Sequence, residues 1–196
     1  FAMRVGTTPP AISTHRNRAG AESAVKEMCE KLLAKIVEQE GARLLGWRDV
    51  PVKSDTIGSQ ARKTEPFMRQ VFIARDALNE AQFERKLYVI RKLVERAIRE
   101  SAIQGREHFY IPSLSANTIV YKGLLLPHQM AAYYQDLTDA SMVSALALVH
   151  SRFSTNTFPT WPLAHPYRYV CHNGEINTLK GNVNYDLSAQ LVDLRG

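Results

Sequence analysis

The sequence predicts an α+β domain in which helices cover central β-sheet material. Two observations favour this class: two long segments carry apolar residues at three- and four-residue steps, and several short apolar runs have strand character. The length of 196 residues allows one domain with a sizeable core, and 45% hydrophobic with 22% charged residues is an ordinary globular composition. No apolar run approaches the roughly 18 residues of a membrane span, and the N-terminus has no signal-peptide core.

The first half of the chain is predicted to alternate helix and strand. A helix begins at Glu22, after a start without clear periodicity, and Gly41 is its expected C-terminal cap. Its apolar stripe comprises Val25, Met28, Cys29, Leu32, Leu33, Ile36 and Val37. A short strand and turn are expected over 43–52, a polar loop over 54–66 and a second strand over 67–74.

A second helix is predicted from Glu80 to Ser101, with Asn79 as its N-cap. Its buried stripe comprises Phe83, Leu87, Ile90, Val94 and Ala97. The remaining expected elements are strands at 108–114, 117–122, 142–150 and 168–172, a short helix at 124–134 and a long loop at 151–166. The run 142–150 is continuously apolar, which is typical of a buried strand.

The net charge of +6 is confined to residues 1–110, which hold 20 Lys and Arg against 14 Asp and Glu, whereas the rest of the chain is neutral. A basic half is one feature of nucleic-acid-binding proteins. Here the charges alternate in sign along the two predicted helices, which is typical of solvated faces. The aromatic residues cluster instead at 153–169, where charge is sparse, so nucleic-acid binding is not favoured.

Asn173 and Gly174 follow the predicted strand 168–172 and allow two interpretations. Asn-Gly most often marks a tight turn, because both residues tolerate positive φ. Alternatively, the Asn amide and a nearby backbone N–H converge on one spot as an oxyanion hole, where Gly permits close approach of the substrate.

Arg152 follows the apolar run 142–150 and is flanked by Ser154 and Thr155. A lone arginine is usually a solvated surface charge. At the end of a buried strand, however, its planar guanidinium is well placed to grip a carboxylate.

The histidines and cysteines suggest no metal site. His150, His165 and His172 match no zinc spacing, and two cysteines exclude a four-cysteine site or a disulfide-dense scaffold. Cys171 is next to His172, but neighbours on a strand point to opposite faces and cannot pair. Cys29 lies on a helical apolar stripe and is interpreted as a core residue.

Two longer runs carry a family resemblance. They are HSRFSTNTFPTWPLAHP at 150–166 and HNGEINTLKGN at 172–182, supported upstream by GWRDVPV at 46–52 and YKGL at 121–124. Together they resemble the glutaminase domain of glutamate synthase large chains, a class II glutamine amidotransferase of the N-terminal-nucleophile hydrolase type. The resemblance covers about residues 22–185, so residues 1–196 are expected to form part of one such domain.

The resemblance implies a fold, a reaction and site residues. The fold would be a four-layer αββα sandwich, present here in part, and the reaction would be hydrolysis of glutamine to glutamate and ammonia. Arg152 would bind the α-carboxylate of glutamine, with Ser154 and Thr155 beside it in the substrate site. Asn173 and Gly174 would form the oxyanion hole. No metal is expected.

For the parent enzyme the resemblance implies a larger cytoplasmic polypeptide. Its remaining domains would use the ammonia to form glutamate from 2-oxoglutarate with FMN and a 3Fe-4S cluster, neither of which is expected in this chain. A small electron-donating subunit is a further expected partner. No nucleic acid or membrane is expected as a partner.

The sequence departs from the family at both ends. The family nucleophile is an N-terminal cysteine whose own α-amine serves as base, whereas residue 1 here is Phe. Residues 1–20 and 186–196 do not resemble the family, and Tyr185 replaces its usual Trp. This chain alone is therefore expected to be an inactive part of the enzyme. The alternative is an amidotransferase-like domain without a nucleophile that serves as a binding or scaffold module.

Overall fold

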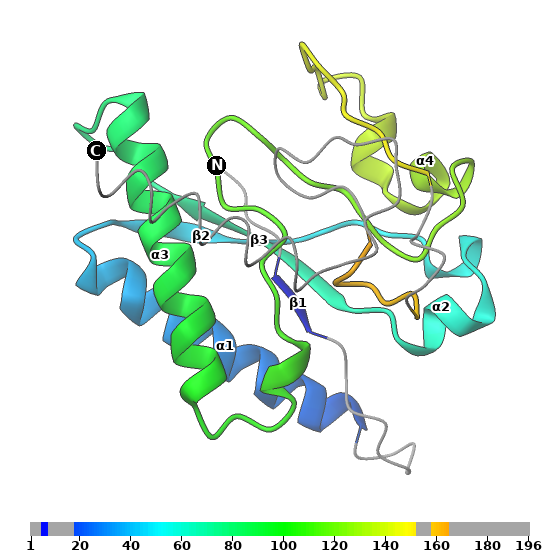
Figure 1. The fold of residues 1–196 in the computed structure, drawn as a ribbon, viewed down its shortest axis with the longest axis horizontal. Coiled ribbons are helices and arrows are strands. Elements are labelled where there is room, and N and C mark those ends of the chain that lie inside the picture. The colour runs from blue at the N-terminus through cyan, green and yellow to red at the C-terminus, as the bar shows by residue number, and fades with distance from the viewer. Residues whose placement is uncertain (1–4, 8–17, 152–157, 165–196) are drawn as a thin grey trace, which may run out of the picture.

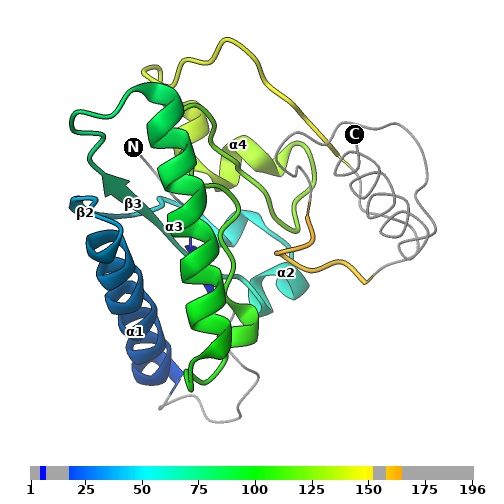
Figure 2. The same cartoon turned by 60° about the vertical axis from the view of Figure 1, so that its left-hand side comes forward.

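A computed structural model describes residues 5–7, 18–151 and 158–164. Its sheet has three antiparallel strands in the order β1 (Val5–Thr7), β3 (Phe67–Ile73), β2 (Leu44–Asp49). The long helices α1 (Arg18–Gln39) and α3 (Glu80–Glu100) lie side by side against this sheet, and the shorter α2 (Ser59–Lys63) and α4 (Gln129–Tyr133) lie away from them (Figures 1 and 2). Three single 3₁₀ turns are η1 (Ser54–Thr56), η2 (Arg106–His108) and η3 (Gln135–Thr138).

Helix α1 confirms the first predicted helix and begins at Arg18, four positions before Glu22. Gly41 ends it as predicted, with a φ of +66°. The N–H of Gly41 donates to the carbonyl of Glu38, and the N–H of Ala42 donates to the carbonyl of Val37. This pair of bonds is the Schellman motif, which satisfies carbonyls that the helix end leaves without intrahelical partners.

Helix α3 confirms the second predicted helix and its N-cap. The side chain of Asn79 accepts the Gln82 N–H at 2.9 Å, and the Gln82 side chain accepts the Asn79 N–H at 3.0 Å, which forms a reciprocal capping box. The buried stripe is Phe83, Leu87, Ile90, Val94 and Ile98. The last buried residue of the stripe is therefore Ile98 and not Ala97, as was predicted. Ala97 is half-buried.

The sheet separates two hydrophobic clusters. Residues 44–49 and 67–73 confirm the two predicted strands, and side chains on β3 alternate between the two faces. Val71 and Ile73 belong to an aliphatic cluster with α1 and α3. Met68 lies on the opposite face and belongs to an aromatic cluster, which we call the Trp161 cluster and which comprises Val50, Ile57, Ala61, Met68, Tyr133, Tyr134 and Trp161.

Three predicted segments differ from the structure. The stretch 54–66 is not a plain loop, because it contains η1 and α2. Neither 108–114 nor 117–122 forms a strand. Side chains organise this region instead: the Glu84 carboxylate accepts the Ala116 N–H and the Ser115 hydroxyl, and the Ser115 oxygen accepts the Asn117 and Thr118 N–H groups. These bonds take backbone donors out of any ladder and tie the segment to α3.

The prediction of a buried strand at 142–150 is also wrong for this structure. The segment has no ladder partner among the described residues, and Val143, Leu146 and Val149 are 91%, 83% and 81% exposed. An apolar run states only which residues can be buried, whereas a strand needs a neighbouring strand for its backbone hydrogen bonds. The short helix expected at 124–134 is confirmed only over the five residues of α4.

The described residues agree with the predicted α+β class, with a helical layer on one face of an antiparallel sheet. Their strands form one sheet, so the four-layer sandwich implied by the resemblance stays a prediction. Within the same residues, no helix has the length and apolar character needed to cross a bilayer. The predicted strand 168–172 falls outside the described residues.

Candidate functional site

Five residues were predicted from the sequence to form the site: Arg152, Ser154, Thr155, Asn173 and Gly174. All five lie outside the described residues. The structure does describe residues 158–164, at the downstream end of the run that carries Arg152, and the surface on which they pack. This surface is the described part of the candidate site.

Trp161 anchors the run 158–164 in the Trp161 cluster. It is 1% exposed, and its indole N–H donates to the carbonyl of Ala61 in α2 at 3.0 Å. Gly123 lies against the face of the ring, where a Cβ atom on Gly123 would come within 2.3 Å of the Trp161 Cζ3 atom. No side chain fits between them, so glycine is required at 123 for a steric reason.

Lys122, which precedes Gly123, contacts Pro162, the residue that follows Trp161. Its ammonium donates to the carbonyl of Pro162 at 2.6 Å and lies 5.5 Å from the centre of the Tyr110 ring. Lys122 is 8% exposed. Burial, and secondarily the positive charge of Arg91, lower the pKa of Lys122 to about 8.

Three tyrosines, Tyr121, Tyr133 and Tyr134, pack together next to Lys122 and Trp161. Tyr134 lies edge-on to both Tyr133 and Tyr121, with ring centres 4.6 and 5.1 Å apart. The Tyr134 hydroxyl donates to the carbonyl of Lys122 at 2.6 Å, and the Tyr133 hydroxyl donates to Glu65 at 2.5 Å. Each buried hydroxyl thus has a partner, and the Tyr134 bond fixes the backbone at Lys122.

Arg48 links strand β2 to the same surface. Its guanidinium holds the carboxylate of Asp136 with two bonds, of 2.5 and 3.1 Å, and donates to the Gln70 side chain at 2.6 Å. The Tyr121 hydroxyl donates at 2.9 Å to Asp136 Oδ2, the oxygen that also accepts the longer bond from Arg48. Hydrogen bonding of the Arg48 guanidinium to the Asp136 carboxylate is the main cause that raises the pKa of Arg48. This two-pronged geometry needs arginine, because lysine carries a single point charge.

The structure therefore brings three separated motifs together: 46–52 through Arg48, 121–124 through Tyr121 to Gly123, and the downstream part of 150–166 through Trp161. Sequence reasoning identified these motifs but did not predict their contacts. It missed Asp136 and Tyr134, which join them. The only available signal was the pair of adjacent tyrosines at the end of the predicted short helix 124–134.

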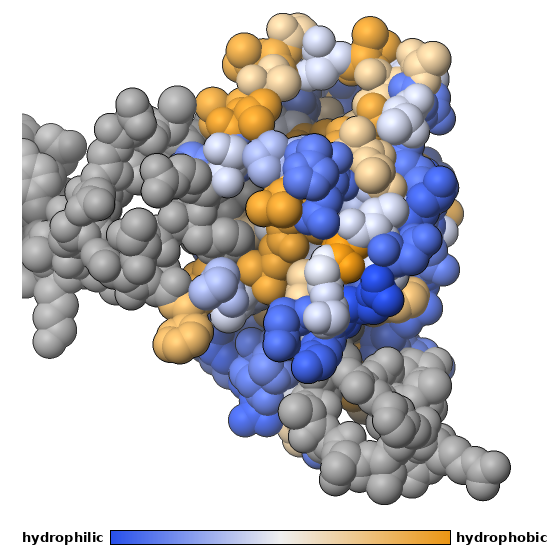
Figure 3. All heavy atoms as spheres, turned by 90° about the vertical axis from the view of Figure 1, so that its right-hand side faces the viewer, coloured by the Kyte–Doolittle hydropathy of each residue, from blue (hydrophilic) through white to orange (hydrophobic). Residues whose placement is uncertain are grey.

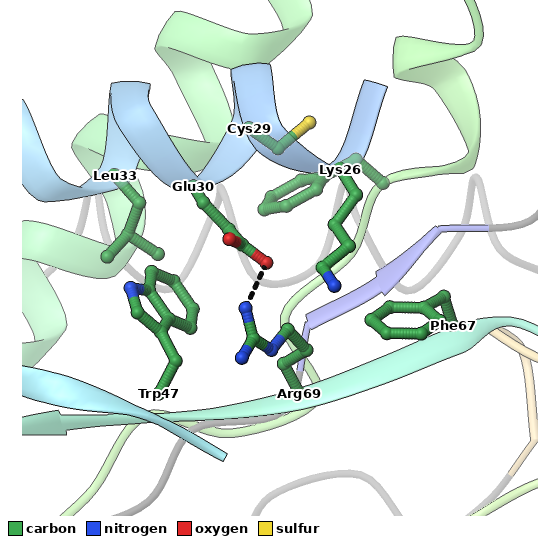
Figure 4. A pocket seen from close by; sticks show the side chains of 8 residues that line it. Lys26, Cys29, Glu30, Leu33, Trp47, Phe67 and Arg69 are labelled. Carbon is green, nitrogen blue, oxygen red and sulfur yellow. Dashed lines mark hydrogen bonds and ion pairs between the residues drawn. The ribbon is translucent and has the colours of Figure 1, made fainter. Parts of the chain in front are cut away.

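A second candidate place lies between α1 and the sheet (Figure 4). Trp47 and Arg69 point from the strands towards α1, where Arg69 pairs with Glu30 at 2.8 Å. Lys26 lies over the ring of Phe67, 4.2 Å from its centre. The enclosed space is only about 10 Å³, which is at the limit for one water molecule and far below a glutamine.

Cys29 lines this same place and is buried and free, as predicted for a core residue. Burial raises the pKa of its thiol to about 11, with a smaller effect from Glu30. The thiolate needed for nucleophilic attack is therefore scarce at neutral pH. Among the described residues, no group of three or more His, Cys, Asp or Glu side chains is arranged to hold a metal ion.

Comparison with known proteins identifies the class. The family described as glutamine amidotransferases class-II matches residues 16–192, so the chain belongs to this family. The particular relatives are glutamate synthases. The large chain of the NADPH enzyme of Bacillus subtilis is 56% identical over 82% of this chain, and that of Azospirillum brasilense is 44% identical over the same share. Ferredoxin-dependent glutamate synthase 2 of Arabidopsis thaliana is 42% identical over 85%. The chain spans about a tenth of the length of these relatives.

Proposed function

We propose that this chain is part of the glutaminase domain of a glutamate synthase, in which glutamine is hydrolysed to glutamate and ammonia. The family match over residues 16–192, together with 56% identity to a glutamate synthase large chain, carries the proposal. The contacts among the motifs 46–52, 121–124 and 158–164 support it, because they form one surface beneath the downstream end of the predicted substrate-binding run. The complete domain would be the four-layer αββα sandwich.

Arg152 is proposed to bind the α-carboxylate of glutamine, with Ser154 and Thr155 beside it. A guanidinium matches a carboxylate with two parallel bonds in both the ground state and the transition state. Its contribution should therefore appear mainly in KM.

Asn173 and Gly174 are proposed to form the oxyanion hole. The carboxamide oxygen of glutamine gains negative charge only when a thiolate attacks its carbon, so donors aimed at this oxygen stabilise the transition state preferentially. The α-amine of the nucleophilic cysteine, which took the thiol proton as base, would return it to the departing nitrogen, so that collapse of the intermediate breaks the C–N bond, releases ammonia and leaves a thioester that water hydrolyses to glutamate. The contribution of Asn173 should therefore appear mainly in kcat.

The nucleophile is proposed to be the N-terminal cysteine that the family resemblance implies and not Cys29, which is buried with a raised pKa. The isolated chain should accordingly release no ammonia from glutamine. The FMN and the 3Fe-4S cluster of the parent enzyme would belong to its other domains, since clusters are held by several cysteine thiolates and this chain has two cysteines. The parent enzyme is proposed to be cytoplasmic and to take electrons from a separate donor.

The test is ammonia release from glutamine by the complete polypeptide. Arg152→Lys should raise KM, whereas the matched surface change Arg75→Lys should leave it unchanged, since Arg75 is exposed on the turn after β3. Asn173→Asp should lower kcat by about 10²–10³ with an unshifted Tm. Wild-type kcat in that variant would reduce Asn173 to a turn residue. A complete polypeptide that binds glutamine but releases no ammonia would instead favour a binding or scaffold module.

A further inference from the structure

We propose that the outward side of α3 is a docking surface for an acidic, partly apolar surface on another part of the synthase polypeptide. Helix α3 lies at the outside of the helical layer (Figure 2). The inference rests on the proposed function in one respect, because it takes this chain to be one part of a longer enzyme. We call this side of α3 the basic face, and its exposed cations are Arg85, Lys92, Arg96 and Arg99.

The spacing of these residues places them on one side of the helix. Arg85, Lys92, Arg96 and Arg99 follow one another at steps that are combinations of three and four residues. The buried stripe that begins at Phe83 occupies the opposite side, where it packs in the aliphatic cluster. The basic face is therefore free of any role in the core.

The acidic residues of α3 are directed elsewhere. The Glu84 carboxylate accepts the Ser115 hydroxyl at 3.0 Å, and the Glu80 carboxylate accepts the Asn117 side chain at 2.7 Å. Both carboxylates thus bind the segment that follows the helix in the chain. The charges that alternate in sign along the sequence of α3 consequently do not alternate over its outward surface.

The basic face keeps an excess of positive charge. Lys92 and Arg96 are paired, with Glu95 at 3.7 Å and Glu100 at 2.8 Å. Arg85 and Arg99 have no ion pair or hydrogen bond among the described residues. On α1, by contrast, the exposed charges over residues 24–39 balance, and they are Glu27, Lys31, Lys35 and Glu38.

Apolar side chains lie among these cations. Tyr88, Val89 and Leu93 are 53%, 41% and 38% exposed. A hollow of about 300 Å³ adjoins them, and Leu78 and Val89 supply its apolar lining beside Arg85. Exposed apolar surface with a polar rim is typical of a protein–protein contact, and the hollow has room for an apolar side chain of the partner.

The chemistry of the basic face favours an acidic protein surface over other partners. A second copy of the same face would bring like charges together. Single-stranded nucleic acid is bound by several stacking aromatics, whereas this face has Tyr88 alone. A membrane-surface helix needs a wide apolar side, and that of α3 is buried in the core. The relatives are about ten times as long as this chain, so other parts of such a polypeptide have ample surface to cover it.

The first experiment compares the rate at which acetic anhydride acylates Lys92 in the 196-residue chain and in the complete polypeptide. The Lys92 side chain is 55% exposed here, and docking should slow its acylation at least about fivefold. Lys31, which is 73% exposed and also lies beside a glutamate, is the matched control and should change by less than about twofold. An unchanged rate at Lys92, or an equal slowing at Lys31, overturns the proposal.

The second experiment tests the charge of the partner. In the complete polypeptide, Arg85→Glu combined with Arg99→Glu should return Lys92 to the rate of the 196-residue chain, because an acidic partner is then repelled. Lys31→Glu combined with Lys35→Glu makes the same change of charge on α1 and should leave Lys92 slow. If the first variant does not fold, Arg85→Ala with Arg99→Ala replaces it. Lys92 that stays slow in either variant of the basic face overturns the acidic partner.

The other partners are tested with the 196-residue chain itself. The probes are a labelled single-stranded oligonucleotide, vesicles that contain phosphatidylserine, and sedimentation of the chain alone to detect self-association. Binding to any of these that is lost with Arg85→Glu and Arg99→Glu overturns the proposal, because it assigns the basic face to that partner.

The outcomes separate this inference from the proposed function. A complete polypeptide that releases ammonia from glutamine while Lys92 reacts as in the 196-residue chain keeps the proposed function and overturns the docking surface. One that protects Lys92 but is inert towards glutamine supports the docking surface and overturns the proposed function.

Discussion

The two faces of the sheet are covered by different kinds of side chain. The face towards α1 and α3 is covered by aliphatic side chains such as Leu33, Leu87 and Val94, which present no polar groups. The opposite face carries the Trp161 cluster, whose aromatic rings bring hydroxyl and N–H groups into the interior. The buried residues of the first cluster are apolar, whereas the second also holds Tyr133, Tyr134 and Trp161 by individually matched hydrogen bonds.

This difference distinguishes the helical layer, which contributes stability, from the surface that supports the proposed site. An aliphatic core requires volume and periodicity, and it tolerates swaps of similar size. A buried polar group requires a partner at a specific distance and angle, and a lost partner leaves an unsatisfied group. The surface beneath residues 158–164 belongs to the second kind. It should accordingly be less tolerant of substitution than the helical layer.

The largest predicted effect is that of Trp161→Ala. Removing a fully buried indole should lower the free energy of unfolding by about 3–5 kcal/mol, since it deletes the ring packing and the hydrogen bond that the indole donates to the Ala61 carbonyl. Urea titration of the 196-residue chain would measure the loss. Leu87→Met, a swap of similar volume in the helical layer, is the reference and should cost less than about 1.5 kcal/mol. Equal losses in the two variants would remove the contrast between the faces.

Arg48→Met should have the next largest effect. It leaves the Asp136 carboxylate without its two-pronged partner, and Asp136 is 8% exposed. Breaking a fully buried pair costs about 3–5 kcal/mol, but the Arg48 side chain is 43% exposed, so we expect about 2 kcal/mol after solvent screening. Arg43→Met breaks the exposed pair with Asp76 and should cost at most about 1 kcal/mol in the same titration. A larger loss for Arg43→Met would contradict this ranking.

The stability contributed by Lys122 should rise with pH. Its pKa is about 8 in the folded chain against 10.5 for the ordinary side chain, so between these values the unfolded state binds more protons than the folded state. The burial penalty is fully present below pH 8 and is relieved as pH rises towards 10.5. Wild type should therefore gain stability relative to Lys122→Met between pH 7.5 and 10 in parallel urea titrations. A difference that did not change with pH would place Lys122 in solvent, and one that moved the other way would mean that folding raises its pKa.

The smallest predicted effect is that of Val143→Ser. Val143 is 91% exposed, so the substitution should change the free energy of unfolding by no more than about 0.5 kcal/mol. The buried strand predicted from the sequence would instead imply a loss of more than 1 kcal/mol. Figure 3 shows apolar surface on the face of the molecule that carries α2 and α4. A loss in the larger range would restore the prediction of burial.

The sequence by itself determined the helical layer. The periodicity of α1 and α3, the cap at Gly41 and the capping box at Asn79 all follow from residues within a few positions of one another. Such local signals are reliable because the hydrogen bonds and the apolar stripe they describe lie within one helix. The motifs that define the family are likewise a property of the sequence alone.

Only the tertiary structure decided which residues contact one another on the opposite face of the sheet. Arg48, Tyr121 and Asp136 are far apart in the chain, and no spacing rule pairs them. The same holds for Gly123, which the structure places against Trp161. Strand formation at 108–122 and 142–150 also depended on partners elsewhere, because a strand is completed by its neighbour and not by its own residues. Interactions between distant segments are set by packing, which the local pattern does not encode.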